Sequence, residues 1–392
     1  MSNVLERTVG AAAISAVRKP LAEASLLPPV VYSSPEIFEL ERETVFARCW
    51  LPVCHVSQLP QAGSYVGRTV VNEPVLAVRD KDNQIQVYSN VCRHRNTTLA
   101  LGEGTCRGAR ITCPYHGWTY GLDGRLLAAP FMDKATGFNR QDFGLLKLRS
   151  EIWHGLVFVN LDPDAAPLAP QLRGLEKYVA GYGMEDWVAV SMATIPAHWN
   201  WKVSLENFTE AYHQPWVHAA TAEPVAPSKG ARYYDNDGGL WSAFLIPNAT
   251  PHSEAGSAAA PKGPPPGPDA LPASIDEGAL VFNIYPYFHS LATSNAILWL
   301  DLSIDSVGRH DLVWRVLFPK AAVADGTEGP LQEFKGFLQP VIQEDVGICT
   351  AVGIGTRSRL ARAGRLSHME KCVHQFHNWW LDGVQARSRR IE

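Results

Sequence analysis

The spacing of hydrophobic positions divides the chain into an early region of short strands and a later region of mixed elements. Between about residues 63 and 91, short apolar runs alternate with polar positions, and Gly and Asp-Asn separate them. This pattern is typical of antiparallel strands. A further apolar run at 155–160 continues it, and a Pro-rich turn follows over 162–170. We therefore predict an N-terminal arm at 1–39 and a β-rich domain at 40–160.

The remainder, residues 161–392, is expected to combine helices with a sheet in a second domain. Apolar residues recur at helical spacing over 38–50, 172–182, 205–217 and 334–349, and strand-like runs lie within 281–318. Residues 250–274 are dominated by Ala, Pro, Gly and Ser. Such a composition excludes a regular helix or central strand and predicts a long mobile loop. The predicted fold class is α+β, with an N-terminal β-rich domain and a C-terminal domain of mixed antiparallel sheet and helices.

Composition narrows the functional classes. Hydrophobic residues make up 46% of the 392 residues and charged residues 19%, an ordinary globular mixture. A net charge of −4 gives no reason to expect nucleic acid or an anionic membrane as a partner. No apolar run reaches the length of a membrane span, and residues 1–20 lack the apolar core of a signal peptide. We therefore expect a cytoplasmic protein.

Two short motifs predict an iron–sulfur centre. They are Cys92-x-His94 and, after eighteen intervening residues, Cys113-x-x-His116. Two thiolates and two imidazoles suit a [2Fe–2S] cluster in which one iron is held by sulfur and the other by nitrogen. A Cys₂His₂ set can also bind structural zinc, but zinc fingers pair cysteine with cysteine and histidine with histidine. The mixed pairing favours the cluster. The other cysteines are expected to be packing residues: Cys49, Cys54, Cys106, Cys349 and Cys372.

A second candidate metal site lies in the segment E-N-F-T-E-A-Y-H-Q-P-W-V-H, residues 206–218. His213 and His218, with a carboxylate from elsewhere, would form the two-histidine, one-carboxylate face of a mononuclear Fe(II) oxygenase. The histidines are five positions apart, which spreads them around an ideal helix, but Pro215 should distort the last turn. A chelating geometry is therefore plausible.

Asp345 is the predicted third ligand. It lies within an apolar helical stripe over residues 334–349. A carboxylate on an apolar face is costly unless it is paired or binds a metal. The neighbouring Glu344 is rotated by about 100° and should face polar surroundings. The alternative, that Asp345 is a surface acid of this helix, stays open.

The sequences C-R-H-R and C-P-Y-H-G-W resemble the Rieske domain of the ring-hydroxylating oxygenases. The respiratory Rieske proteins join their two loops by a disulfide, but Thr97 and Tyr115 stand at those cysteine positions, and Trp118 replaces a serine that bonds to the cluster. The oxygenase family usually has Gly where this chain has Asn96. Asn tolerates a left-handed conformation better than most residues, so we expect the turn to form.

The resemblance extends to the second motif and implies roles for its residues. It implies that His213, His218 and Asp345 hold a mononuclear non-haem iron and that Asn207 and Tyr212 support these ligands. Glu210 would bridge this iron to the Rieske histidine of an adjacent subunit, which implies a head-to-tail homotrimer. The spacing from Asn207 to Glu210 is similar to that in the glycine betaine, carnitine and anthranilate branch.

The function implied by this resemblance is that of the terminal oxygenase component of a multicomponent system. A separate NAD(P)H-dependent reductase, directly or through a ferredoxin, would deliver electrons for the oxidation of a small organic substrate by O₂. The main prediction is hydroxylation of a small aromatic compound, and the alternative is N-demethylation or monooxygenation of a quaternary ammonium compound. A Rieske electron carrier without oxygenase activity is the alternative of another class. The candidate pocket residues are Phe282, Tyr285, Tyr287, Phe288, Trp299 and Trp216, although residues of these types more commonly belong to the core of a sheet.

Overall fold

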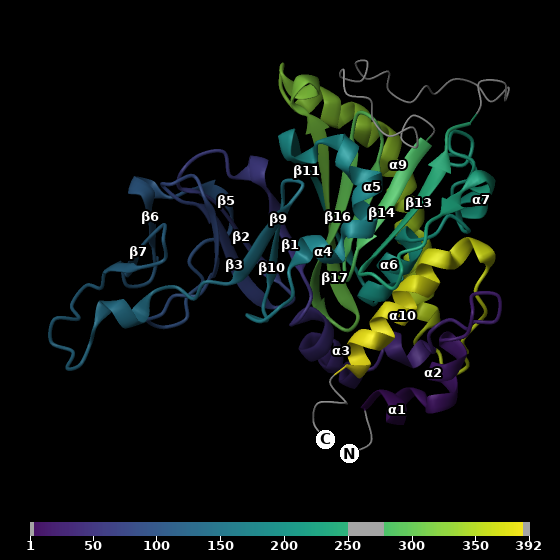
Figure 1. Cartoon of the computed structure of the whole chain (residues 1–392), viewed down its shortest axis with the longest axis horizontal. Helices are drawn as coiled ribbons and strands as arrows, with labels where there is room; N and C mark the ends of the chain where they lie inside the picture. Colours follow the sequence, from purple (N-terminus) through teal and green to yellow (C-terminus); the bar gives the residue numbers. More distant parts are fainter. Residues whose placement is uncertain (1–3, 250–277, 387–392) are drawn as a thin grey trace. The chain divides into compact units, whose positions relative to one another are not determined.

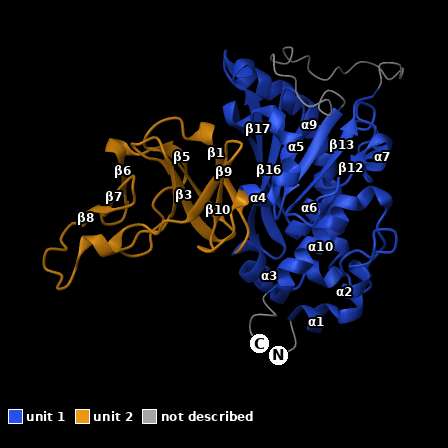
Figure 2. Ribbon diagram, in the orientation of Figure 1, with its two compact units in different colours: residues 1–47, 169–392 blue, residues 48–168 orange. Residues whose placement is uncertain are grey.

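The computed structural model describes residues 4–249 and 278–386, which form two compact units (Figure 2). The smaller unit comprises residues 48–168, and the larger unit joins the chain before residue 48 to the chain after residue 168. The predicted loop at 250–274 lies outside the described residues.

Both boundaries of the β-rich domain differ from the prediction, because the observed unit covers 48–168 and not 40–160. The N-terminal arm predicted at 1–39 is part of the larger unit, and the β-rich unit begins at residue 48 rather than 40. The helix predicted at 38–50 is observed as α3, Pro35–Glu41, followed by a π-helical turn at Arg42–Phe46. It therefore belongs to the larger unit.

The smaller unit contains three antiparallel sheets, as the alternating pattern predicted (Figure 1). Their strand orders are β1-β10-β9, β4-β3-β2-β5 and β6-β7-β8. The strands are β1 Leu51–His55, β2 Ser64–Val70, β3 Glu73–Arg79, β4 Ile85–Ser89, β5 Gly102–Thr105, β6 Arg110–Thr112, β7 Thr119–Gly121, β8 Leu126–Ala128, β9 Arg149–Trp153 and β10 Leu156–Asn160.

The larger unit is built on a seven-stranded antiparallel sheet in the order β11-β17-β16-β15-β14-β13-β12 (Figure 1). The strands are β11 Trp187–Ala197, β12 Arg232–Tyr233, β13 Trp241–Pro247, β14 Gly278–Ile284, β15 Phe288–Ala292, β16 Ile297–Ser306 and β17 Arg309–Pro319. The strands predicted over 281–318 are therefore confirmed, and so is the α+β class.

The helices of the larger unit lie before, between and after these strands. Their bounds are α1 Val4–Val9, α2 Ala11–Val17, α3 Pro35–Glu41, α5 Arg173–Val179, α6 Trp201–Phe208, α7 Gln214–Val217, α9 Glu328–Gly355 and α10 Lys371–Gln385, while the short α4, Leu168–Gln171, begins at the boundary between the units. The single helix predicted at 205–217 is wrong, because the chain forms α6 and α7 with a break between them.

Strand register builds a continuous apolar row across the large sheet. Phe244 lies opposite Val281, Val281 opposite Leu291, and Leu291 opposite Leu298. Successive side chains of a strand point to opposite faces, so these four side chains share one face. Helices α6 and α9 contact each other on this side, and α5 covers the other face, where Tyr178 packs against Trp241.

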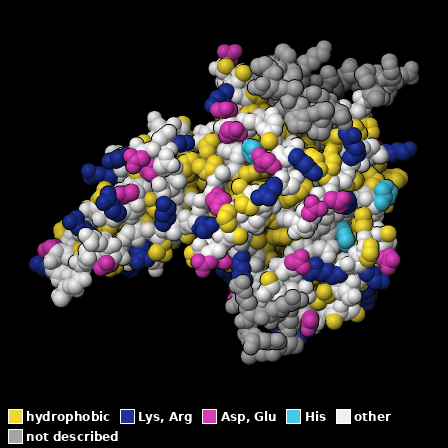
Figure 3. Space-filling model, viewed as in Figure 1, with side chains coloured by type: hydrophobic (Ala, Val, Ile, Leu, Met, Phe, Trp, Pro, Cys, Tyr) yellow, Lys and Arg dark blue, Asp and Glu magenta, His cyan; other side chains and the backbone are white. Residues whose placement is uncertain are grey.

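All seven cysteines are free thiols. Of the five predicted to be packing residues, Cys54, Cys349 and Cys372 are buried, and Cys49 and Cys106 are half-buried. No helix among the residues described is both long enough and apolar enough to span a membrane. On the face drawn in Figure 3, acidic and basic side chains are intermixed, as the small net charge leads one to expect.

Candidate metal centres

The four predicted cluster ligands lie on two tight turns of the smaller unit. Cys92 and His94 follow β4, and Cys113 and His116 connect β6 to β7. Both cysteines are buried in the core of this unit. Asn96 has a φ of 56°, so the left-handed conformation expected of it is confirmed. The turn closes through a hydrogen bond of 3.0 Å from the Asn96 N–H to the Cys92 carbonyl.

The two histidine rings of these turns lie side by side. Their centroids are 4.7 Å apart, and the His94 ring stacks on Trp118 at 4.9 Å. The Nδ1 atom of His94 is buried and has no hydrogen-bond partner among the described residues. A buried nitrogen without a partner is costly unless it binds a ligand. The two buried sulfurs and the paired rings therefore fit a [2Fe–2S] cluster.

The arrangement of donor atoms also bears on the zinc alternative. A single zinc ion needs its four donors gathered tightly around one point. Within the described ranges, the only three His, Cys, Asp or Glu side chains with donor atoms all within 4.8 Å of one another lie elsewhere, in the larger unit. The Cys92–His116 set is thus more widely spread, as a two-iron cluster requires.

Tyr120 supports the cluster turns through its hydroxyl, a role that the sequence analysis missed. The hydroxyl lies 3.3 Å from the Cys92 sulfur and accepts a hydrogen bond of 3.0 Å from the Arg93 N–H. Burial, together with the contact to Cys92, raises the pKa of Tyr120 well above its usual range. It therefore stays protonated and can donate to a thiolate. The available signal was its position two residues after the end of the C-P-Y-H-G-W motif.

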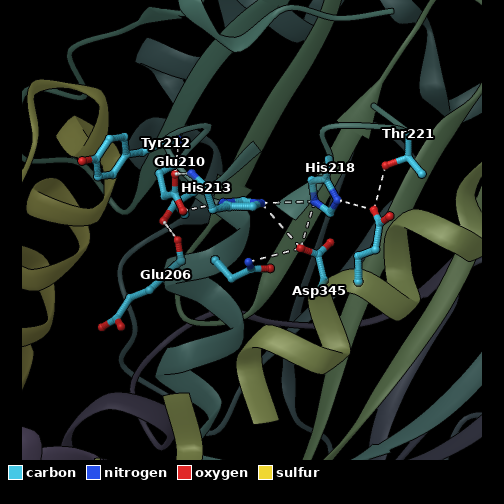
Figure 4. Close-up of polar contacts among 10 residues, drawn as sticks. Glu206, Glu210, Tyr212, His213, His218, Thr221 and Asp345 are labelled. Atoms are coloured by element: carbon cyan, nitrogen blue, oxygen red, sulfur yellow. Dashed lines mark hydrogen bonds and ion pairs between the residues drawn. The ribbon is translucent and has the colours of Figure 1, made fainter. Parts of the chain in front are cut away.

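In the larger unit the structure brings His213, His218 and Asp345 together (Figure 4). The Nε2 atoms of the two histidines are 3.3 Å apart, and they lie 3.5 and 3.1 Å from the Asp345 Oδ1 atom. Donor atoms bound at about 2.1 Å and at right angles to one ion are about 3 Å apart. The three side chains therefore fit one face of an octahedral metal ion.

Both histidines adjoin α7, after the break that separates it from α6. Helix α6, Trp201–Phe208, is capped at its start by Asn200, whose side chain accepts a hydrogen bond from the Lys202 N–H. Helix α7 is a single turn with Pro215 near its start, where proline needs no N–H donor. His213 and His218 flank this turn at its two ends. A single turn of helix thus carries both histidines, and their Nε2 atoms meet beside Asp345.

Three further residues were predicted to act around this site, and two of them reach it. The Asn207 amide donates a hydrogen bond of 3.3 Å to Asp345, and the Glu210 carboxylate accepts one of 2.5 Å from His213 Nδ1. The Tyr212 side chain does not reach the ligands: it is half-exposed and points away from them (Figure 4). Only its backbone N–H contributes, by donating to Glu210.

The hydrogen bonds between the carboxylates and histidines of this site shift the pKa values of both kinds of group. Burial lowers the pKa of His213, but hydrogen bonds with Asp345 and Glu210 outweigh it and raise that pKa to about 10. Burial raises the pKa of Asp345, but its hydrogen bonds with both histidines outweigh this and lower that pKa. A divalent cation would supply the same positive charge without the proton. The donor set and its charge therefore fit a mononuclear ferrous ion.

A cavity of about 90 Å³ adjoins the three residues. Its polar lining, near the donor atoms, consists of Asn207, Glu210, His213, Gln214, His218 and Asp345. Its apolar lining consists of Phe208, Ala222, Phe244, Ile246, Val281, Leu291, Leu298, Trp314, Leu338, Val341 and Ile342. The apolar row of the large sheet therefore forms one wall of the cavity.

None of the pocket residues suggested by the sequence lines this cavity. Phe282, Tyr285, Tyr287, Phe288 and Trp299 are buried core residues, and Trp216 is 84% exposed. Strand parity explains the error for Phe282, which alternates with Val281 and therefore points to the opposite face of the sheet. The core alternative was correct for five of the six.

Comparison with known proteins identifies a family for each part of the chain. Residues 49–145 match the Rieske [2Fe-2S] domain, and residues 184–386 match the catalytic domain of the ring hydroxylating alpha subunit. The chain is 35% identical over 204 residues to the carnitine monooxygenase oxygenase subunit of Acinetobacter baumannii, covering 52% of this chain and 55% of that protein. It is 32% identical over 240 residues to the biphenyl 2,3-dioxygenase subunit alpha of Rhodococcus jostii, covering 56% and 52%. The chain thus spans about half the length of these curated relatives.

A solved structure shares the fold over nearly the whole chain. It is the quaternary ammonium Rieske monooxygenase CntA in complex with an inhibitor. Its TM-score is 0.77, with coverage of 91% of this chain and 94% of that one, at 24% sequence identity.

Proposed function

Because this chain belongs to the family of ring-hydroxylating oxygenase alpha subunits, we propose that it is the terminal oxygenase component of a Rieske non-haem iron oxygenase. The observation that carries the proposal is the cluster of His213, His218 and Asp345, with donor atoms 3.1 to 3.5 Å apart beside an apolar cavity. A protein that only carried electrons would have no use for this second set of ligands.

The residues divide between two cofactors. Cys92, His94, Cys113 and His116 would hold the [2Fe–2S] cluster, and His213, His218 and Asp345 would hold the iron. When bound, the cluster would supply electrons one at a time, and the iron would supply the chemistry of O₂ activation beside the substrate. In a monooxygenation, two electrons and two protons are consumed, and one oxygen atom enters the substrate while the other leaves as water.

The protein around the iron would orient its ligands and exclude water from the reaction. Asn207 would hold the Asp345 carboxylate and Glu210 would hold the His213 ring, through the hydrogen bonds described above. The apolar wall would hold the reacting part of the substrate close to the metal.

The proposed cluster would have to receive its electrons from another protein. A separate NAD(P)H-dependent reductase would reduce the cluster, either directly or through a ferredoxin. We also propose that three copies associate head to tail, with Glu210 linking the iron of one copy to the cluster of the next.

We infer that the substrate is a quaternary ammonium compound. The carnitine monooxygenase relative supports this choice, which was the alternative in the sequence analysis and not its main prediction. Phe208, Phe244 and Trp314 offer aromatic faces in the cavity, and aromatic faces attract such cations. Hydroxylation of an N-methyl group followed by loss of formaldehyde would give the demethylated amine.

An aromatic substrate is the second candidate. An apolar row favours this candidate, because an uncharged ring can be buried against it without the cost of desolvating a charge. The row consists of Phe244, Val281, Leu291 and Leu298. The biphenyl dioxygenase relative also supports it.

Reconstitution tests both the reaction class and the substrate. The purified chain, loaded with iron and supplied with O₂, NADH and a reductase, would be given carnitine or biphenyl in parallel. We expect a demethylated or hydroxylated amine from carnitine, whereas a hydroxylated product from biphenyl alone would establish the aromatic candidate. No product from a broad panel of either class, with both metal centres present, would contradict the oxygenase proposal.

The variant His213→Ala provides the matched control for the metal assignment. It should keep the visible absorption of the cluster and lose product formation by at least a hundredfold, because the iron loses one of three protein ligands. Retention of wild-type turnover by this variant would contradict the assignment of His213.

A further inference from the structure

His218 is held at both ring nitrogens by neighbouring residues of one helix. Its Nε2 atom lies 3.1 Å from Asp345 Oδ1, and its Nδ1 atom lies 2.8 Å from Glu344 Oε2. Side chains of adjacent helical residues diverge by about 100° around the axis. Helix α9 therefore presents two diverging carboxylates, and the imidazole ring of His218 lies between them.

Thr221 fixes the outer carboxylate. Its hydroxyl donates a hydrogen bond of 2.7 Å to Glu344 Oε2, the oxygen that also contacts His218 (Figure 4). The Glu344 side chain is 32% exposed, whereas that of His218 is 4% exposed. A partly exposed glutamate has considerable rotamer freedom, and the bond from Thr221 restricts it.

The two histidines of the site are anchored in different ways. His213 donates to Glu210, which lies three residues earlier on the same turn of chain. His218 donates to Glu344, which comes from a helix more than a hundred residues later in the chain. The orientation of His218 therefore depends on α9, the helix that also provides Asp345.

We infer that Glu344, held by Thr221, is a positioning residue that keeps the His218 proton on Nδ1 and so presents the Nε2 lone pair to the metal. This inference rests on the proposed iron site and adds to it two residues that do not touch the metal. A neutral imidazole carries its proton on one nitrogen only, so an acceptor at Nδ1 selects the form that binds through Nε2.

Metal affinity provides a test that does not depend on turnover. The mononuclear site of the full-length protein would be emptied, with the cluster retained, and reloaded with Co(II), whose visible absorption reports its ligands. Competition with a chelator would give the dissociation constant for the wild type and for Glu344→Ala, Glu344→Gln and Thr221→Val. The matched control is Glu333→Ala, which removes an exposed carboxylate from the same helix.

We expect Glu344→Ala to weaken Co(II) binding by about 10- to 100-fold, the usual effect of losing such a support. Glu344→Gln should recover most of the affinity, because its amide oxygen still accepts from Nδ1. Thr221→Val should weaken binding by a smaller factor, and Glu333→Ala should match the wild type. Alanine and glutamine are both good helix formers, so a difference in affinity between these two variants does not come from helix propensity.

Two outcomes would overturn the inference, and they differ from failure of the proposed function. If Glu344→Ala binds Co(II) as tightly as the wild type does, Glu344 has no positioning role. If Glu344→Ala does not fold and Thr221→Val binds Co(II) with wild-type affinity and spectrum, the inference also fails. If the wild type itself binds no Co(II) while its cluster is intact, the proposed iron site fails instead.

Discussion

Tyr120 places a hydroxyl 3.3 Å from the Cys92 sulfur, inside the core of the smaller unit. A hydrogen bond to a ligand sulfur stabilises the reduced cluster, which carries one more electron, and therefore raises the reduction potential. We predict that Tyr120→Phe lowers this potential. A difference of about 1 kcal/mol, typical of one hydrogen bond, corresponds to roughly 40 mV for a one-electron couple.

A redox titration followed by EPR would measure this change. The matched control is Tyr88→Phe, because Tyr88 lies in the same core and donates its hydroxyl to the Leu122 carbonyl at 3.1 Å. This control loses a buried hydrogen bond without touching sulfur. Equal potentials for the wild type and Tyr120→Phe would show that the hydroxyl does not donate to Cys92.

The behaviour of a single residue can be predicted from the sequence where the residue type itself limits the backbone conformation or requires a partner. Asn96 could be assigned a left-handed conformation, because few residues adopt it at low cost. Asp345 could be singled out, because an acid within an apolar stripe needs a partner. The direction of the Tyr212 side chain depended on the exact end of α6, and the contact between Glu344 and Thr221 depended on tertiary packing. Neither could be predicted from local pattern.

At the scale of elements, helices α3, α6 and α10 meet at a buried ion pair. Glu41 of α3 and Lys202 of α6 are both fully buried, and their side chains are 2.5 Å apart. Glu41 also accepts hydrogen bonds of 2.9 and 2.8 Å from the indole N–H groups of Trp201 and Trp380. Burial lowers the pKa of Lys202, and Glu41 opposes this shift. One carboxylate thus fixes the helix that leads into the proposed iron site.

We predict that Glu41→Ala destabilises the larger unit by about 3–5 kcal/mol, because it leaves a buried ammonium group without a counter-charge. Chemical denaturation followed by tryptophan fluorescence would measure the free energy of unfolding. The control Glu39→Ala removes an exposed glutamate of the same helix that pairs with Arg42 at the surface, and it should cost about 1 kcal/mol or less. Similar losses for both variants would contradict a special role for the buried pair.

The strands and the long helix α9 were predicted correctly, whereas the helix at 205–217 was not. Alternating strands and the long α9 helix have a periodic apolar face, so their type follows from the sequence. The helix predicted at 205–217 was divided wrongly, because its apolar spacing continues through the break between α6 and α7. The single turn of α7 is maintained by the tertiary structure around the two histidines, and periodicity does not report this.

At the scale of the whole molecule, the arm before residue 48 is part of the larger unit. Tyr32, in this arm, donates a hydrogen bond of 2.6 Å to Glu206, which also accepts one of 2.9 Å from His377 of α10. No local pattern in residues 1–39 reveals such contacts, because their partners lie about 170 and 345 residues later in the chain. Composition could locate a boundary near residue 40 but could not assign the arm to a unit.

The proposed head-to-tail trimer makes a prediction that only the assembled molecule can test. The variant Cys92→Ser would lack the cluster and keep the iron, and His213→Ala would lack the iron and keep the cluster. Each should be inactive alone. If electrons pass between neighbouring subunits, a mixed trimer contains one working pair, in which an intact cluster faces an intact iron on the next copy.

The expected activity follows from random assembly of equal amounts of the two variants. Three of every four trimers are then mixed, and each mixed trimer has one working pair, whereas a wild-type trimer has three. About a quarter of wild-type activity should therefore return. The measurement is product formation after the two variants are co-expressed, compared with a simple mixture of separately purified trimers as the control. If electrons passed only within one chain, no combination would restore activity, and the proposed role of Glu210 between subunits would fail with it.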